Sequence, residues 1–365
     1  MIVSEIRLRN FRNYDLAEIE LDPRMNLITG HNAQGKTNLL ESLVYLSLTR
    51  SFRVSEDRKL IRSGADFARL SCRVKEKDQR DVLLEAVIHS GGKNLAVNRQ
   101  PVKKTSEFVG KLNTVLFSPD DLGIFLDSPR ERRRLLDQEI TKVSSGYLFA
   151  LKNYRSLLKD RNALLKKHIP DFSYLEILET RMIDQELVII QERRDFIEAI
   201  NRAMPGCYRT LSGQDQETVI RYDCCVDPYG ENLAERLADM YRSSREKDID
   251  YHTTLNGIQR EDIIFTLDGE NVINTASQGQ KRMIMLGFKL AILRFIEERS
   301  HKKAVLLLDD VLSELDRDRQ KTLMGMIQEP YQCVITGTEI PDFLRTGSLR
   351  EFKVEQGAIQ EVRHE

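Results

Sequence analysis

The 365-residue sequence has few of the features that mark secreted, membrane-spanning or disulfide-linked proteins. Its five cysteines show no CxxC spacing, so we expect free thiols rather than disulfides or a zinc site. It has no long uncharged apolar run, which excludes an ordinary membrane-spanning helix. The first residues, MIVSEIRLRN, carry charges where a signal peptide needs an apolar core. We therefore expect a cytoplasmic protein without a membrane partner.

The net charge of −1 excludes a global field that would draw the protein onto nucleic acid. Any binding of DNA phosphates must then come from local clusters of basic residues. The candidate contacts are Arg50, Arg53, Arg130, Arg132, Arg133 and Arg134. A run of charges is more often a solvated face, and Glu131 interrupts the second cluster, so both interpretations stay open.

The spacing of apolar residues changes along the chain. Alternation over residues 2–21 and 68–97 predicts strands of an antiparallel meander, which is interrupted by a helix that starts near Lys36. Steps of four and three from Leu136 to Leu164, broken only at Arg161, predict a coiled-coil seam. A second helical run from Leu175 to Ile200 should fold back on it. This middle part is either an arm or an ordinary helical subdomain.

The motif GHNAQGKT is the strongest chemical signal, because it fits G-x-x-x-x-G-K-[ST] and lies between an apolar strand, MNLIT, and a helix. The predicted phosphate-binding residues are Gly30, His31, Asn32, Ala33, Gln34, Gly35, Lys36 and Thr37. In such a loop, backbone N–H groups and the helix N-terminus meet the phosphates of ATP. Lys36 reaches the terminal phosphates, and Thr37 binds Mg²⁺.

A second element is AVLLLDDVLSELD, in which an apolar strand delivers two acids to its carboxyl end. Asp309 is the candidate Mg²⁺ ligand, and Asp310 could orient or deprotonate the attacking water. The alternative is that one of these acids caps a helix.

The stretch ASQGQ resembles the LSGGQ signature of ABC-type ATPases, and it stands in the same order between phosphate loop and acidic strand. The resemblance implies that Ser277, Gln278, Gly279 and Gln280 cap the γ-phosphate bound by a second subunit. On that view Ser277 takes part in catalysis together with Lys36, Asp309 and Asp310. Taken alone, Ser277 could be no more than the N-cap of a helix.

Several further motifs narrow the family. IRLRNFRNY, NAQGKTNLLE, TRSFR, FSPDDL and LLLDDVLSELD together resemble the RecF family of bacterial recombination-repair ATPases along the whole chain. The resemblance places Arg12 and Asn13 near the adenine. It implies an ATP-dependent homodimer that binds double- and single-stranded DNA at gaps and junctions. It also implies partnership with RecR and RecO, RecA loading, and slow DNA-stimulated ATP hydrolysis.

The predicted fold class is therefore α/β, a P-loop NTPase head of the ABC type whose mixed sheet carries an antiparallel meander. Residues 1–120 and 270–365 should form the head, and residues 121–269 an inserted helical arm with a short coiled coil. Two other functions remain open, namely an ATPase head of the OLD defence type and a scaffold that binds ATP without meaningful hydrolysis. Aspartate at position 310, where ABC transporters usually have glutamate, is consistent with slow turnover. Thr336 or Thr338 stands where a switch histidine is common.

Overall fold

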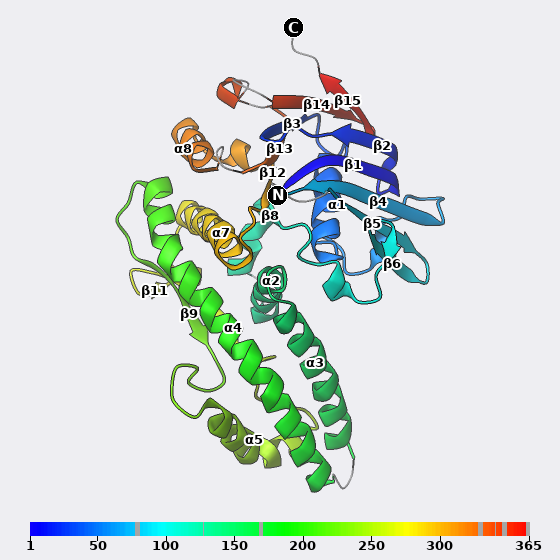
Figure 1. Ribbon diagram of the computed structural model, residues 1–365. Coiled ribbons are helices and arrows are strands. Elements are labelled where there is room, and N and C mark those ends of the chain that lie inside the picture. Colours follow the sequence, from blue (N-terminus) through cyan, green and yellow to red (C-terminus); the bar gives the residue numbers. More distant parts are fainter. Residues whose placement is uncertain are drawn as a thin grey trace. The chain divides into compact units, whose positions relative to one another are not determined.

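The computed structural model describes residues 1–76, 81–126, 128–167, 171–327, 331–339, 341–344 and 349–362 (Figure 1). The chain divides into two compact units. The first comprises Met1–Asp121, Cys207–Gln214 and Met285–Glu365, and the second comprises Leu122–Gly206 and Asp215–Ile284. Among the described helices, none is long and apolar enough to cross a membrane.

One layer of the first unit is an antiparallel sheet with the strand order β2-β1-β4-β5-β6-β7. The strands are β1 (Ile2–Phe11), β2 (Tyr14–Glu20), β4 (Phe67–Lys75), β5 (Val82–His89), β6 (Gly92–Val97) and β7 (Gln100–Pro101). Along β1, Ile6 and Leu8 are buried whereas Arg7 and Arg9 are exposed, because successive side chains point to opposite faces. The predicted antiparallel meander is confirmed.

The second layer is a mixed sheet with the order β15-β14-β3-β13-β12-β8. Its strands are β3 (Met25–Thr29), β8 (Thr114–Phe117), β12 (Val305–Asp309), β13 (Cys333–Gly337), β14 (Leu349–Glu355) and β15 (Ala358–Val362). All neighbours are parallel except β14 and β15. Every residue of β12 and β13 is buried, as expected for central parallel strands. The carboxyl ends of β3, β12 and β13 therefore share one edge, where such sheets bind ligands.

Helix α1 (Lys36–Leu48) lies between the two layers of the first unit. It contacts β4 and β5 of the antiparallel sheet and β8, β12 and β13 of the mixed sheet. Its residues from Leu39 to Leu48 are all buried, and a helix surrounded by core on all sides needs few polar positions. The unit also holds α8 (Arg317–Ile327), most of α7 (Gln278–Ser300) and the short 3₁₀ turns Asp57–Leu60, Thr105–Glu107, Val311–Glu314 and Asp342–Leu344. A further 3₁₀ turn, Pro119–Phe125, crosses the boundary of the units.

The second unit is mainly helical. Its elements are α2 (Pro129–Thr141), α3 (Ser145–Leu165), most of α4 (Phe172–Ser212), β9 (Thr218–Asp223), α5 (Leu233–Asp250), β10 (Asp262–Leu267), β11 (Glu270–Asn271), α6 (Val272–Thr275) and the start of α7. Helices α3 and α4 run antiparallel, with Arg161 paired to Glu179 and Tyr147 bonded to Arg193 (Figure 1). The strands form an antiparallel sheet in the order β11-β10-β9. A tight turn at Asp268-Gly269 joins β10 to β11.

The predicted helical seam is wrong in one respect, because it is not one continuous helix. Helix α2 ends at Thr141, and Ser144 caps α3 by accepting the N–H of Tyr147 at 3.1 Å. A serine at the N-cap stabilises the start of a new helix by satisfying a backbone N–H of its first turn. Arg161, which interrupts the apolar seam, is fully buried rather than exposed.

Candidate functional site

The predicted phosphate loop joins β3 to α1 at the carboxyl edge of the mixed sheet. Both glycines of the loop, Gly30 and Gly35, lie where a side chain would clash with neighbouring atoms. A Cβ on Gly30 would lie 2.3 Å from the carbonyl oxygen of Val354, and one on Gly35 would lie 2.7 Å from the side chain of Asn13. Both glycines also have φ in the left-handed half of the map, at 148° and 120°. The loop therefore keeps a close backbone path that only glycine permits.

Lys36, the first residue of α1, is 4% exposed and folds back over the loop. Its Nζ donates to the carbonyl of Gly30 at 2.8 Å and to that of His31 at 3.2 Å. An ammonium group held among loop backbone atoms, at the N-terminus of a helix, is placed to meet an anion.

Asp309 is the last residue of β12 and accepts hydrogen bonds from two threonine hydroxyls on neighbouring elements. Thr37 of α1 donates to its Oδ1 at 2.9 Å, and Thr336 of β13 donates to the same atom at 2.8 Å. Burial raises the pKa of Asp309 above its ordinary value, while the two threonine hydroxyls act in the opposite direction. Thr37 and Asp309, predicted together as Mg²⁺ ligands, are thus adjacent, and their oxygen atoms are the donors that this cation prefers.

Asp310 turns the chain away from the sheet. Its backbone is left-handed, with φ 52° and ψ 15°, a conformation that aspartate tolerates better than most residues. Its N–H donates to the hydroxyl of Thr336 at 3.1 Å. Thr336 therefore bridges the two acids, and of the two threonines considered for the switch position it is the one in contact with Asp309.

The turn between β1 and β2 supports the phosphate loop from one side. Asn13 donates from Nδ2 to the carbonyl of Gln34 at 2.7 Å, and its Oδ1 accepts from Asn38 at 2.9 Å. Arg12 instead makes a bidentate ion pair with Glu41 of α1, at 2.7 and 2.8 Å. In this arrangement Asn13 contacts the loop directly, whereas the guanidinium of Arg12 is held by Glu41, whose side chain is fully buried.

The turn between β14 and β15 supports the loop from another direction. Gln356 donates its N–H to Oε1 of Gln34 at 2.6 Å, and Gly357 donates its N–H to the carbonyl of the same residue at 3.2 Å. A Cβ on Gly357 would lie 2.4 Å from the carbonyl oxygen of Asn13. Sequence reasoning missed this support and that of Glu41, because nothing in the local pattern links these positions to the loop.

The signature-like residues lie at the start of α7, in the second unit. Ser277 and Gln280 form a reciprocal capping box. The Ser277 hydroxyl accepts the N–H of Gln280 at 3.2 Å, and the Gln280 side chain accepts the N–H of Ser277 at 2.9 Å. Ser277, Gln278 and Gly279 are exposed, and a Cβ on Gly279 would meet only the Ser277 hydroxyl, at 4.0 Å. Ser277 is thus a helix N-cap, and the described chain does not itself require glycine at position 279.

The predicted DNA contacts near the phosphate-loop helix differ in their surroundings. Arg50 is exposed and directly follows Thr49, the C-cap of α1. Arg53 is also partly exposed, and it donates to Asn38 at 2.9 Å, one step from Asn13. Arg53 therefore touches the polar network beside the loop.

The arginine cluster on α2 is less uniform than its sequence indicates. Arg132 is 6% exposed and makes a bidentate ion pair with Asp262, at 2.8 and 2.7 Å. Arg133 donates to a backbone carbonyl, and Arg134 pairs at 3.2 Å with the acid three residues earlier. Arg130 is exposed. A DNA contact from Arg132 would therefore require its buried ion pair to break.

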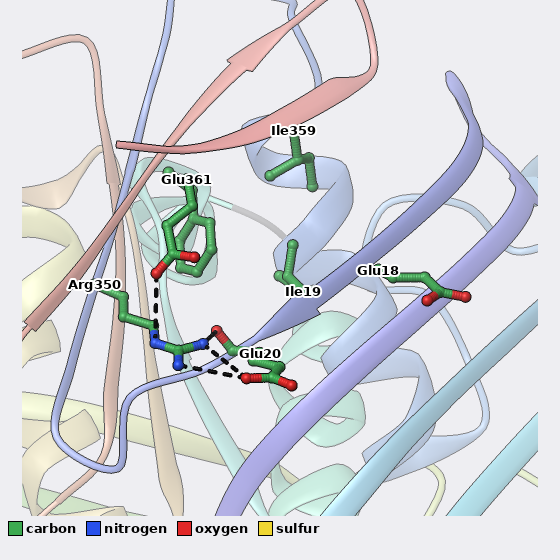
Figure 2. Close-up of a pocket in the computed structure, with 7 residues that line it drawn as sticks. Glu18, Ile19, Glu20, Arg350, Ile359 and Glu361 are labelled. Atoms are coloured by element: carbon green, nitrogen blue, oxygen red, sulfur yellow. Dashed lines mark hydrogen bonds and ion pairs between the residues drawn. The ribbon is translucent and has the colours of Figure 1, made fainter. Parts of the chain in front are cut away.

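A separate hollow in the first unit lies between β2 and the β14–β15 hairpin (Figure 2). Arg350 crosses it, donating to the carbonyl of Glu20 at 2.8 Å and lying 3.5 Å from Glu361. In the sheet Arg350 is beside Asn26, near the amino end of β3. The hollow is therefore at the opposite end of that strand from the phosphate loop, and it is not part of the site.

The chain is similar to known proteins along most of its length. The family described as RecF/RecN/SMC N terminal domain matches residues 2–354. The DNA replication and repair protein RecF of Lactobacillus johnsonii is 38% identical over 349 residues, which cover 93% of each chain. The protein of the same name from Bacillus subtilis is 35% identical over 370 residues, covering 98% of this chain and 100% of its own.

Two solved structures are also similar to this chain. A structure of the recombination mediator protein RecF with ATP, in the RecFOR pathway, superposes with a TM-score of 0.92 at 33% identity. It covers 99% of this chain and 98% of its own. The Smc head domain of Pyrococcus furiosus, at 18% identity, has a TM-score of 0.59 over 99% of this chain and 96% of its own, which shows the shared fold alone.

Proposed function

The chain belongs to the RecF family, and from that premise we propose that it is an ATP-binding mediator of recombinational DNA repair. One observation carries the proposal. Lys36 and Thr37 at the start of α1 lie beside Asp309 at the end of β12, at the carboxyl edge of the mixed sheet, and the glycines of the adjoining loop are held against Val354 and Asn13. This arrangement fits a nucleoside triphosphate, because it combines a buried cation, a helix N-terminus and a pair of cation-binding oxygens.

Each residue has a separate task in this proposal. Lys36 exchanges the loop carbonyls for phosphate oxygens. Thr37 and Asp309 hold Mg²⁺, and Thr336 keeps the carboxylate of Asp309 in place by its hydrogen bond. Asn13 and Gln356 keep the loop open by binding Gln34 from two sides. ATP supplies a γ-phosphate whose presence or loss separates two states of the protein.

We further propose that the Ser277–Gln280 segment completes the site of a second subunit. Ser277, Gln278 and Gly279 are exposed, and the Ser277 oxygen accepts a hydrogen bond from Gln280, so that its own hydroxyl hydrogen can be donated outward. Glycine at position 279 leaves room for another molecule to approach. A nucleotide favours such a homodimer only to the extent that the dimer binds it more tightly than the monomer does.

Hydrolysis in this proposal is slow and rests on Asp310. The residue follows the Mg²⁺ ligand directly, and its left-handed backbone aims its side chain differently from that of Asp309. Orienting a water molecule is the role that this position supports. We propose that DNA stimulates this weak ATPase activity.

The proposed substrate is DNA with a gap or a junction between double and single strands, in partnership with RecR and RecO upstream of RecA. Arg50, Arg53 and Arg130 support phosphate contact best, because they are at least partly exposed. Arg133 and Arg134 remain candidates, whereas Arg132 carries a structural ion pair. The division into a head of residues 1–120 and 270–365 and an arm of residues 121–269 also stays a proposal.

A sedimentation experiment tests the core of the proposal. The wild-type chain should dimerise when ATP and Mg²⁺ are added, and Lys36→Ala should neither bind nucleotide nor dimerise. Lys321→Ala, on the exposed side of α8, is the matched control and should behave as wild type. A gel shift on gapped and blunt duplexes, with and without ATP, tests the substrate. Equal binding to all of them regardless of ATP would contradict it.

A further inference from the structure

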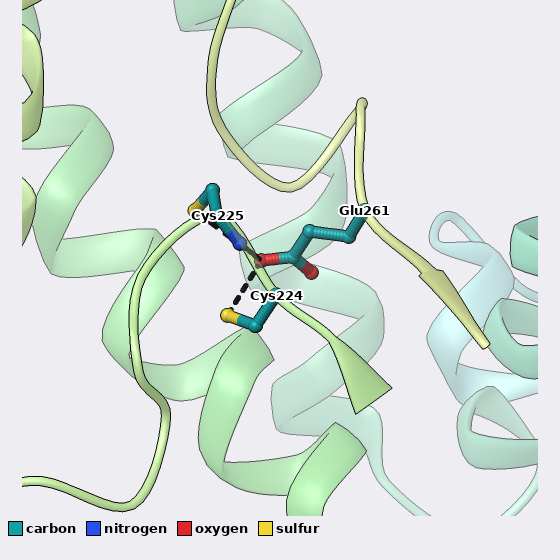
Figure 3. A group of neighbouring side chains, drawn as sticks. All are labelled: Cys224, Cys225 and Glu261. Carbon is teal, nitrogen blue, oxygen red and sulfur yellow. Dashed lines mark hydrogen bonds between the residues drawn. The ribbon is translucent and has the colours of Figure 1, made fainter. Parts of the chain in front are cut away.

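Two adjacent cysteines and a buried glutamate meet in the second unit, where the β9–β10 ladder ends (Figure 3). Cys224 and Cys225 directly follow β9, and Glu261 directly precedes β10. The last ladder pair is Asp223 with Asp262, so one more step of the same antiparallel register sets Cys224 opposite Glu261. Backbone pairing therefore brings these side chains together, although they are far apart in sequence.

The distances are close to those of one face of a tetrahedral metal site. Oε1 of Glu261 lies 3.0 Å from Sγ of Cys224 and 3.4 Å from Sγ of Cys225, and all three atoms lie within 4.8 Å of one another. Zinc bonds to sulfur and oxygen give ligand–ligand separations of roughly 3.6–3.8 Å. The two sulfur–oxygen distances would lengthen by roughly 0.2–0.6 Å to admit such an ion.

The carboxylate of Glu261 is held in a single orientation by residues behind it. Its Oε2 accepts from Arg193 at 2.6 Å and from the hydroxyl of Tyr222, which leaves Oε1 directed at the two sulfurs. Glu261 is 2% exposed and Arg193 is 1% exposed. Hydrogen-bonded partners that fix a ligand in this way are typical of metal sites. The charge of Arg193 also offsets the negative charge that two thiolates and a carboxylate leave around a divalent cation.

We propose that Cys224, Cys225 and Glu261 bind one thiophilic divalent cation of the Zn²⁺ class. Two sulfurs and one oxygen suit such an ion, whereas Mg²⁺ and Ca²⁺ require oxygen ligands. Both cysteines are only partly buried, so solvent can reach the site and supply a fourth ligand. The sequence lacks the CxxC spacing that indicates zinc, since the two cysteines are adjacent and the third ligand directly precedes β10.

The bound ion would join the end of β9 to the start of β10. Arg193 extends this connection, since it also pairs with Asp137 of α2 at 2.9 Å and donates to Tyr147 of α3 at 3.0 Å. The ion would therefore stabilise the second unit by linking its sheet to its helices. This proposal does not depend on the phosphate loop or on nucleotide.

The test uses the reduced, metal-stripped full-length protein and Co²⁺ as the spectroscopic probe. One equivalent should produce the visible bands of tetrahedral cobalt together with thiolate-to-metal charge transfer in the near ultraviolet. Zn²⁺ should then displace the cobalt and remove both signals. Weak octahedral bands without charge transfer would overturn the proposal.

Variants show which residues bind the Co²⁺ that gives the absorption bands. Cys224→Ser and Cys225→Ser should each reduce the charge-transfer intensity and weaken binding. Cys207→Ser, which removes a buried thiol of the first unit, should change neither. Tyr222→Phe keeps all three ligands but removes one of the two side-chain hydrogen bonds that orient the carboxylate, and should weaken Co²⁺ binding by about 10–100-fold. Unchanged binding in both Cys224→Ser and Cys225→Ser would refute the site. The site would also be refuted if, under the reducing conditions of the assay, the two cysteines formed a disulfide with each other and the protein did not bind Co²⁺.

Discussion

Glu186 of α4 should make the stability of the protein depend on pH. Its side chain is fully buried among residues of three other segments. Oε1 accepts from Tyr241 of α5 at 3.0 Å and from the N–H of Ile258 at 3.4 Å, and Tyr154 of α3 lies nearby. Oε2 is buried, and no described residue forms a hydrogen bond with it. Burial, reinforced by the charge of Glu261, raises the pKa of Glu186 from 4.5 to about 8.

The sign of the effect follows from proton binding. Between the unfolded pKa and the folded value of about 8, the native protein holds one proton that the unfolded chain has released. The stabilisation is therefore complete below the unfolded pKa and is lost as the pH rises through the folded pKa. Over the two units from pH 6 to pH 8, the loss is about 2 kcal/mol.

Glu186→Gln isolates this contribution, because glutamine resembles the protonated carboxyl group and cannot ionise. The free energy of unfolding, measured by urea denaturation at pH 6, 7 and 8, should fall by about 2 kcal/mol more in the wild type than in the variant. Glu198→Gln, which removes a partly exposed carboxylate from the same helix, is the control and should follow the wild type. Wild-type and Glu186→Gln curves that stay parallel within about 0.5 kcal/mol would refute the reasoning.

Three further outcomes are expected. Ser277→Arg should keep ATP binding but block dimerisation in sedimentation, whereas the exposed control Ser243→Arg on α5 should dimerise normally; a dimer in both would exclude the proposed role in trans. Asp310→Asn should leave a long-lived ATP dimer with reduced phosphate release, and unchanged turnover would remove this residue from hydrolysis. Arg161→Leu leaves Glu179 and Asp248 without their shared cation, and should lower the free energy of unfolding by about 3–5 kcal/mol in urea; a loss below about 1 kcal/mol would contradict it.

The parts of the fold that follow from local pattern could be predicted. An unbroken apolar run ending in acids indicated β12 and Asp309, and the glycine-rich motif between strand and helix indicated the loop before α1. Parallel strands place their carboxyl ends together, so the contact between Thr37 and Asp309 was within reach of the sequence.

Other parts depend on partners that the local sequence does not reveal. Arg161 interrupts an apolar seam, and only the folded chain shows that Asp248 of α5 neutralises it. Helix α5 itself was not predicted, since most of its residues are polar and few recur at helical spacing. The ion pair between Arg12 and Glu41 and the bond from Gly357 to Gln34 likewise join residues with no shared pattern.

The position of β3 in its sheet has a consequence for the time at which the protein can fold. Its two neighbours, β13 and β14, are both near the other end of the chain, and Asn26 of β3 bonds to Cys333 of β13 across 307 positions. At about 5–20 residues per second, a ribosome needs roughly 15–60 seconds to make that interval. During this part of synthesis, the apolar strand β3 therefore cannot pair with β13 or β14, which have not yet been made. A chaperone that shields the emerging MNLIT segment should increase the yield of active protein more than one that acts after release.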